Sequence, residues 1–195
     1  MARPREFDPD TALEGAMQVF WSRGYGATNL PDLLEAMGLT RGSFYKAFGD
    51  KRAVYLQVLR RYDVEVIGSA VALLADRALG AGAARILALF EQAFAGSSLS
   101  RRGCLVCNAM VELGPSDAEV ARLTAQMCLR LQRAIEGALR DDRDGAARAE
   151  NDDGLGHRAS AITNIYFGAQ AISRAGTPQP DWRPLLADLM AAPAP

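Results

Sequence analysis

The sequence predicts an all-α protein, and three observations carry that prediction. Hydrophobic residues recur three to four positions apart in almost every segment, which is the period of a helix. No stretch of convincing length shows the alternation that a β-strand requires. The 195 residues are 49% hydrophobic and 23% charged, a globular composition in a chain long enough to bury a core.

Three short helices open the chain and are predicted at about residues 8–23, 31–37 and 41–47. Pro9 suits the first position of the first helix, and Gly24 closes that helix. Thr28 or Asn29 is placed to cap the second helix, which Gly38 ends. A short turn at residues 38–41 then joins the second and third helices into a helix-turn-helix.

Longer helices follow, and they are predicted at about residues 51–75, 86–94, 103–113, 116–140, 155–174 and 181–190. Ser116, with Glu119 three residues later, indicates a capping box at the start of the fourth of these. Residues 141–154 are acidic and poor in apolar side chains, so we expect a loose loop there. The N-terminus lacks the apolar region of a secretory signal and no apolar run is long enough to span a membrane, so we expect a soluble, cytoplasmic protein.

The third helix lies in the segment LTRGSFYKAFGDK, residues 39–51. Phe44 and Phe48 are four positions apart, so they share a face that can hold this helix against the other two. Tyr45 lies off that face, where its hydroxyl can bind a phosphate oxygen. Gly42 and Ser43 keep the start of the helix narrow enough to enter a DNA major groove, which is about 12 Å wide.

Positive charge is concentrated around this helix. The cations of residues 38–62 are Arg41, Lys46, Lys51, Arg52, Arg60 and Arg61. Against these six cations stands one acid, Asp50, which gives a local net charge of +5 in a chain of net charge −1. A solvated basic face would explain the charge alone, but the turn and the Gly-Ser-Phe-Tyr order favour binding to nucleic acid.

The N-terminal third of the chain resembles the TetR family of bacterial transcriptional regulators, over the run ALEGAMQVFWSRGYGATNLPDLLEAMGLTRGSFYKAFGDKRAVYLQVL. The shared features are the Arg-Gly-Tyr-x-x-Thr junction at residues 23–28, the Met-Gly end of the second helix, the Gly-Ser-Phe-Tyr third helix and the Phe-Gly-Asp-Lys start of the fourth. One departure is visible. Many members have His before the Phe, where this chain has Ala47, and Lys46 is placed to supply the missing contact.

The resemblance implies a homodimer with a helix-turn-helix DNA-binding domain at residues 1–52 and a ligand-binding and dimerisation domain at residues 53–195. It implies a repressor that a small molecule or thiol modification releases from a palindromic operator in double-stranded DNA. The residues expected to contact DNA are Thr28, Thr40, Arg41, Gly42, Ser43, Tyr45, Lys46 and Lys51. Of these, we expect Arg41 and Ser43 to reach base edges and the others to position the helix, mainly through phosphates.

The C-terminal helices are expected to supply the dimer interface and the effector pocket. The predicted interface is an apolar face that a monomer would expose, made of Trp182, Leu185, Leu186 and Leu189. The pocket candidates lie on inward helix faces and are Phe90, Phe94, Cys107, Asn108, Met110, Met127, Leu131, Tyr166 and Gln170. The polar members need partners when buried, which indicates a small, largely apolar ligand with one hydrogen-bonding group, although each member alone is equally explained as core.

The three cysteines are an odd number, which argues against a disulfide framework. Cys104 is expected in the first turn of its helix, just after Arg101 and Arg102, where the helix dipole and the cations would lower a thiol pKa. Cys104 is therefore a redox-sensing candidate, and the alternative is a small buried hydrophobe. Cys128 lies within a helix and is expected to react more slowly.

No catalytic site or cofactor is expected. The sequence has no P-loop and no nucleophile elbow, and the three cysteines and His157 lack the spacing of a zinc site. Two alternatives to a regulator stay open: a thiol-dependent enzyme that uses Cys104, and an all-α ligand carrier that does not bind DNA. The first lacks an evident base, and the second leaves the local charge of +5 unexplained.

Overall fold

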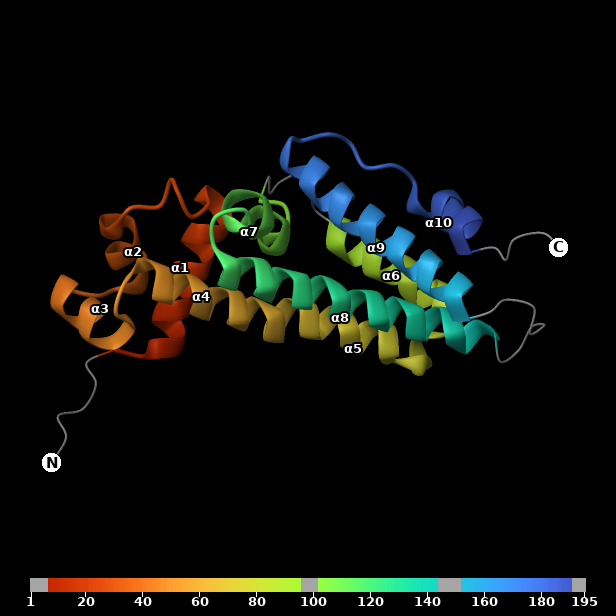
Figure 1. Ribbon diagram of the computed structural model, residues 1–195, viewed down its shortest axis with the longest axis horizontal. Coiled ribbons are helices and arrows are strands. Elements are labelled where there is room, and N and C mark those ends of the chain that lie inside the picture. Colours follow the sequence, from red (N-terminus) through yellow and green to blue (C-terminus); the bar gives the residue numbers. More distant parts are fainter. Residues whose placement is uncertain (1–6, 96–101, 144–151, 191–195) are drawn as a thin grey trace, which may run out of the picture. The chain divides into compact units, whose positions relative to one another are not determined.

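The computed structural model of the chain describes residues 7–95, 102–143 and 152–190 (Figure 1). These residues form helices joined by short connections, and those three ranges contain no strand, which confirms the predicted all-α class. Most of the predicted loop at residues 141–154 falls outside the described ranges, as does Arg101. No helix within them is long and apolar enough to cross a membrane.

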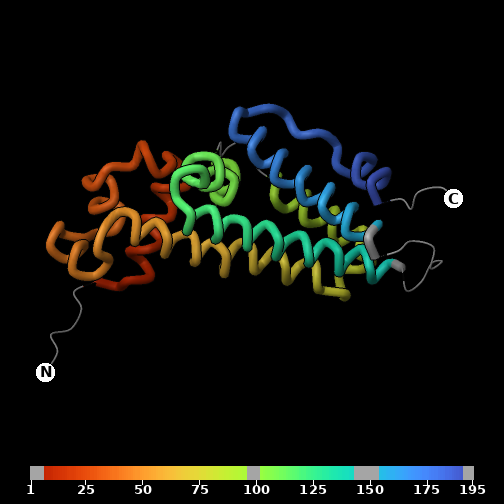
Figure 2. The backbone as a smooth tube through the Cα atoms, in the orientation of Figure 1, coloured from red at the N-terminus to blue at the C-terminus, as the bar shows by residue number. Residues whose placement is uncertain are grey.

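The helical segments in chain order are α1 (Pro9–Arg23), α2 (Leu30–Met37), α3 (Arg41–Phe48), α4 (Lys51–Tyr62), a π-helical turn (Asp63–Ile67), α5 (Gly68–Ala75), a 3-10 turn (Arg77–Leu79), α6 (Gly82–Phe94), α7 (Leu105–Leu113), α8 (Ala118–Arg143), α9 (Asp152–Arg174) and α10 (Trp182–Met190). The chain passes from α4 through the π-helical turn into α5 with no non-helical residue between them, as the tube in Figure 2 shows. The helix predicted at residues 51–75 is therefore present, with a π-helical turn inside it.

The chain divides into two compact units. The first contains Met1–Asp63 and Leu105–Thr124, and the second contains Val64–Cys104 and Ala125–Pro195. α7 and the first residues of α8 thus belong with the N-terminal helices, although more than forty residues of sequence separate them from α4. The functional boundary predicted after residue 52 remains a prediction.

Capping groups set the ends of the short helices in the first unit. The Asn29 side chain accepts a bond from the Asp32 amide at 2.9 Å, and the Asp32 carboxylate accepts one from the Asn29 amide at 3.0 Å, so α2 begins with a reciprocal capping box. Gly38 ends α2 in the left-handed conformation, at φ 63°. The Thr40 hydroxyl then accepts a bond from the Ser43 amide at 3.2 Å and caps α3.

Aromatic rings fill the core of the first unit. α1 packs against α2 and α4, and α3 packs against α4. Phe20 is fully buried, and its ring meets that of Tyr55 edge-on at a centroid distance of 4.9 Å. Phe44 and Phe48 are both buried, which confirms the predicted inward face of the third helix.

The second unit packs α6 against α5 and α10, with α9 also against α10. Its core includes Leu74, Ile86, Phe90, Leu131, Ile135, Leu155, Ile162 and Leu186. Arg85 is only 1% exposed, and its guanidinium pairs with the Asp141 carboxylate at 2.7 Å. The neighbouring Asp142 accepts a bond from the Gly82 amide at the start of α6. Both aspartates lie in α8, so the helix predicted to end near residue 140 continues to Arg143.

The start of α8 corrects the predicted capping box. Asp117 caps this helix, because its Oδ1 atom accepts bonds from the amides of Glu119 at 3.1 Å and Val120 at 3.3 Å. The Ser116 hydroxyl instead donates to the carbonyl of Leu113, in the preceding helix. Asp117 directly precedes the first helical residue and is as good a cap as serine, so it takes the position predicted for Ser116.

α10 corrects the predicted exposed face. Trp182 is 7% exposed and Leu186 is fully buried, so a single chain already covers both. The reason is that the Trp182 ring lies against Phe90 and Phe94 of α6, at centroid distances of 4.9 and 5.0 Å. Leu185 is 38% exposed and stays available for a second subunit. Leu189 is partly buried against the core of its own unit.

Candidate nucleic-acid interface

α3 has one buried face and one exposed face. Phe44 and Phe48 anchor it to the first unit, and Ser43 is partly buried at its start. The exposed residues are Arg41, Gly42, Tyr45 and Lys46. Their spacing places them along one side of the helix, opposite the anchors. No atom outside the neighbouring helix backbone lies within 4 Å of where a Gly42 Cβ would stand, so this side of α3 is open.

The turn between α1 and α2 holds Thr28, whose side chain is only 1% exposed. Its hydroxyl donates to the Gly24 carbonyl at 2.6 Å and so closes the turn. A phosphate contact through this hydroxyl would require that bond to open. The predicted phosphate role of Thr28 therefore competes with a structural one.

Lys51, the first residue of α4, lies beside the same turn. Its ammonium nitrogen is 4.2 Å from the centroid of the Tyr25 ring, a cation–π contact. The Tyr25 ring is itself fixed by neighbouring rings, at 6.0 Å from Phe20 and 4.9 Å from Tyr55. Lys51 thus rests on an aromatic surface and keeps its hydrogen-bond donors for another partner.

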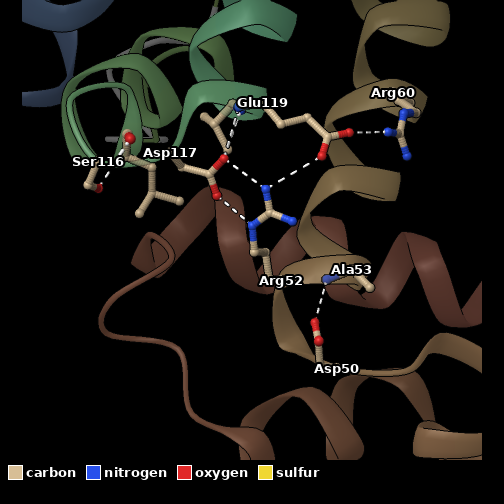
Figure 3. Close-up of polar contacts among 9 residues, drawn as sticks. Asp50, Arg52, Ala53, Arg60, Ser116, Asp117 and Glu119 are labelled. Carbon is tan, nitrogen blue, oxygen red and sulfur yellow. Dashed lines mark hydrogen bonds and ion pairs between the residues drawn. The ribbon is translucent and has the colours of Figure 1, made fainter.

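Other cations of the basic segment pair with acids of the first unit (Figure 3). Arg52 binds both carboxylate oxygens of Asp117, through Nε at 2.6 Å and Nη2 at 2.9 Å. Arg60 pairs with Glu119 at 2.7 Å. The hydrogen bonds from the Arg52 guanidinium lower the pKa of Asp117 to about 2, and the same contact raises the pKa of Arg52. Arg61, in turn, lies 3.6 Å from the Glu14 carboxylate.

The local charge of +5 is therefore partly neutralised by the fold. Within the residues that the structure describes, Arg41 and Lys46 have no acidic partner, and Lys51 has only its aromatic support. These three residues lie on α3 and at the start of α4. They form the available positive charge beside the exposed side of α3, in the place where a helix entering a groove meets phosphates.

The helix-turn-helix matches a known family. The model for bacterial regulatory proteins of the tetR family matches residues 12–58. YezE of Bacillus subtilis, described as an uncharacterized HTH-type transcriptional regulator, is 30% identical over 158 residues, which cover 78% of this chain and 79% of YezE. This chain belongs to the TetR family. It is a helix-turn-helix transcriptional regulator.

Two further comparisons extend the likeness of this TetR-family chain. ComR of Escherichia coli, an HTH-type transcriptional repressor, is 32% identical over 136 residues, and the match covers 69% of this chain and 64% of ComR. A solved structure of a cysteine mutant of CifR, a TetR-family transcriptional regulator complexed with a 26-base-pair double-strand operator, is 28% identical. It covers 96% of this chain and 98% of CifR, with a TM-score of 0.79.

The effector residues predicted for this TetR-family regulator fall in both units. Those in the second unit include an aromatic cluster, in which Phe90 and Tyr166 lie 5.3 Å apart and Phe94 and Tyr166 lie 6.3 Å apart. The Gln170 amide donates to the Tyr166 hydroxyl at 3.4 Å. Trp182, predicted at the dimer interface, belongs to this cluster instead.

The remaining effector candidates are divided between helices. Met127 and Leu131 are buried in α8, within the second unit. Cys107, Asn108 and Met110 lie on α7, which belongs to the first unit. Cys107 is buried and Met110 is exposed. Their role in ligand binding remains a prediction.

The thiols differ from the predicted arrangement in one respect. α7 begins at Leu105, so Cys104 precedes the helix and does not lie in its first turn. The reason is Gly103, whose positive φ of 61° departs from helical geometry. Cys104 is buried, and burial also raises the pKa of Cys128 to about 11, with a further contribution from Cys104. No group of three or more potential metal ligands occurs in the described parts of the chain.

Proposed function

We propose that this TetR-family regulator is a repressor. A homodimer binds a palindromic operator in double-stranded DNA through α3, and a small-molecule effector or modification of a thiol releases it. The protein acts in the cytoplasm, where its DNA target lies, and has no catalytic role. The relatives described above are transcriptional regulators, which supports this assignment over an enzyme.

The observation that carries the proposal is the two-faced third helix. Two buried phenylalanines fix α3, while its exposed side offers a guanidinium, a phenol and an ammonium around a glycine. Arginine can bind guanine through two hydrogen bonds, and the lysine and tyrosine suit phosphates. Within a two-fold dimer, two such helices reach half-sites one helical turn apart, about 34 Å.

Exposed apolar residues of the second unit support dimer formation. Ile172 on α9 is 54% exposed and Leu185 on α10 is 38% exposed. An isologous interface would cover each residue with the matching surface of a second chain. We assign these two residues to the interface in place of Trp182 and Leu186, which their own chain buries.

The aromatic cluster of the second unit is the proposed effector region. Phe90, Phe94, Tyr166 and Trp182 offer ring surfaces to an apolar ligand. Gln170 and the Tyr166 hydroxyl offer the hydrogen-bonding groups. An effector that binds only one of two conformations shifts the population between DNA-competent and DNA-incompetent forms.

Selection of bound duplexes from a random pool tests the proposal. The purified protein should recover a two-fold symmetric sequence whose half-sites lie about 10 base pairs apart, and sedimentation should show a dimer. Recovery of no common sequence, or of a site without symmetry, would contradict the proposed operator. A stable monomer at micromolar concentration would contradict the homodimer.

A further inference from the structure

One carboxylate of α7 reaches the turn between α1 and α2. Glu112 Oε2 accepts a hydrogen bond from the Tyr25 amide at 2.9 Å, and its Oε1 accepts one from the Gly26 amide at 2.5 Å. Both amides belong to the Arg-Gly-Tyr-x-x-Thr junction, 86 and 87 residues away in the chain. A carboxylate that holds two adjacent amides restrains the turn more than one neutral hydrogen bond would.

The glycines of this turn allow the carboxylate to come so close. A Cβ atom on Gly24 or on Gly26 would lie 3.0 Å from an oxygen of Glu112. Gly24 also has a φ of 86°, which L-residues rarely adopt. The turn and the carboxylate therefore fit one another closely, and the fit depends on small residues on one side and a charged acceptor on the other.

The clamped turn leads directly to a predicted DNA-binding cation. Tyr25, whose amide Glu112 holds, also carries the ring that supports the Lys51 ammonium at 4.2 Å. The same ring packs against Tyr55 of α4 at 4.9 Å. Backbone and ring of Tyr25 are thus both fixed, and the position of the ammonium follows from the position of the ring.

We infer that Glu112 is a positioning residue for DNA binding. It fixes the turn between α1 and α2, and through the Tyr25 ring it holds Lys51 where that cation meets a phosphate. This inference rests on the proposed function, because it assumes that Lys51 contacts DNA. It gives α7 a defined task in operator binding, although α7 lies outside the segment 1–52 predicted to bind DNA.

A merely stabilising role for Glu112 predicts something different. Loss of a clamp that only stabilises the fold would weaken binding equally in any background and would leave the number of phosphate contacts unchanged. Loss of a clamp that positions Lys51 removes one phosphate contact per protomer. The salt dependence of binding reports that number, at about 0.9 log units of affinity per log unit of salt for each contact.

The experiment compares Glu112→Ala in three backgrounds: wild type, Lys51→Ala and Lys46→Ala. Operator affinity is measured by fluorescence anisotropy across a salt series, on the duplex selected by the wild-type protein. In the wild-type and Lys46→Ala backgrounds, Glu112→Ala should weaken binding about five-fold and flatten the slope by about two units per dimer. In the Lys51→Ala background, the same change should cost less than about two-fold, because the contact is already absent.

Equal losses in the two lysine backgrounds, or an unchanged salt slope, would overturn the inference. If Glu112→Ala does not fold by circular dichroism, Tyr25→Leu serves instead, with Tyr25→Phe as its matched control. The leucine variant should reproduce the loss of slope, and the phenylalanine variant should bind as the wild type does. Failure of the wild-type protein to select any sequence is a different outcome, which refutes the proposed function itself.

Discussion

Replacement of Lys46 by alanine should weaken operator binding in a way that the fold makes calculable. Lys46 is exposed on α3 and lacks an acidic partner among the residues described. Each protomer would lose one phosphate contact, so a dimer would lose two. Two contacts correspond to a salt slope that is lower by about 1.8 units, and to about thirty-fold in affinity at 0.15 M salt.

Arg60→Ala is the matched control for this change. Arg60 removes the same charge, and it comes from the same basic segment. Its guanidinium, however, already pairs with Glu119 at 2.7 Å. We expect the salt slope of Arg60→Ala to stay within about half a unit of the wild-type slope, because no phosphate contact is lost.

Both variants are assayed by fluorescence anisotropy on one operator duplex between about 50 and 300 mM salt, where the slope is linear on logarithmic axes. Circular dichroism checks that each variant is folded. An equal fall in slope for the two variants would show that the ion pair with Glu119 opens on DNA. It would refute the distinction between paired and available cations.

Three further predictions concern stability and reactivity. Leu186→Ala should lower the free energy of unfolding in urea by about 2–5 kcal/mol, because the side chain is fully buried; Leu185→Ala should cost less than about 1 kcal/mol, and the reverse order would contradict the assigned orientation of α10. The pKa of Asp117 is depressed from 3.8 to about 2, so its pairing with Arg52 stabilises the fold above the ordinary value and loses that effect as pH falls toward 2. Arg52→Ala should therefore unfold more readily than the wild type near neutral pH and match it near pH 2, and a constant difference at every pH would exclude this linkage. Burial raises the pKa of Cys128 to about 11, so its alkylation rate, followed by mass spectrometry, should still be rising at about pH 10, whereas a plateau below that pH would show an ordinary thiol.

Local signals in the sequence were sufficient for the helix-turn-helix. Asn29 and Gly38 begin and end the second helix through contacts with residues a few positions away, so a short window contains all the information. The four-residue spacing of Phe44 and Phe48 similarly fixed which side of α3 is buried. These elements could be predicted because their causes lie close to them in the chain.

The available charge of the interface could not be predicted in the same way. The segment 38–62 contains only one acid, so its net charge appears fully available. The acids that neutralise Arg52 and Arg60 lie 65 and 59 positions away, in the turn before α8 and in its first residues. Glu112 escaped notice for the same reason, because its partners lie in another part of the sequence.

The face of α10 shows a related limit. Its apolar spacing predicted correctly that one side of the helix is buried, but periodicity does not say which surface covers that side. The rings of α6 cover Trp182 within the same chain. An apolar face therefore predicted contact, and only the fold distinguished contact within one chain from contact with a second chain.

The most direct test of the central claim is to repeat the duplex selection with Arg41→Ala. If α3 reads the operator, this variant should lose about 1–3 kcal/mol of affinity and relax its preference at one position in each half-site. Lys46→Ala, a phosphate contact on the same helix, should bind more weakly but select the unchanged sequence. Selection of the wild-type sequence by Arg41→Ala with undiminished preference at every position would contradict the assignment of α3 residue Arg41 to base recognition.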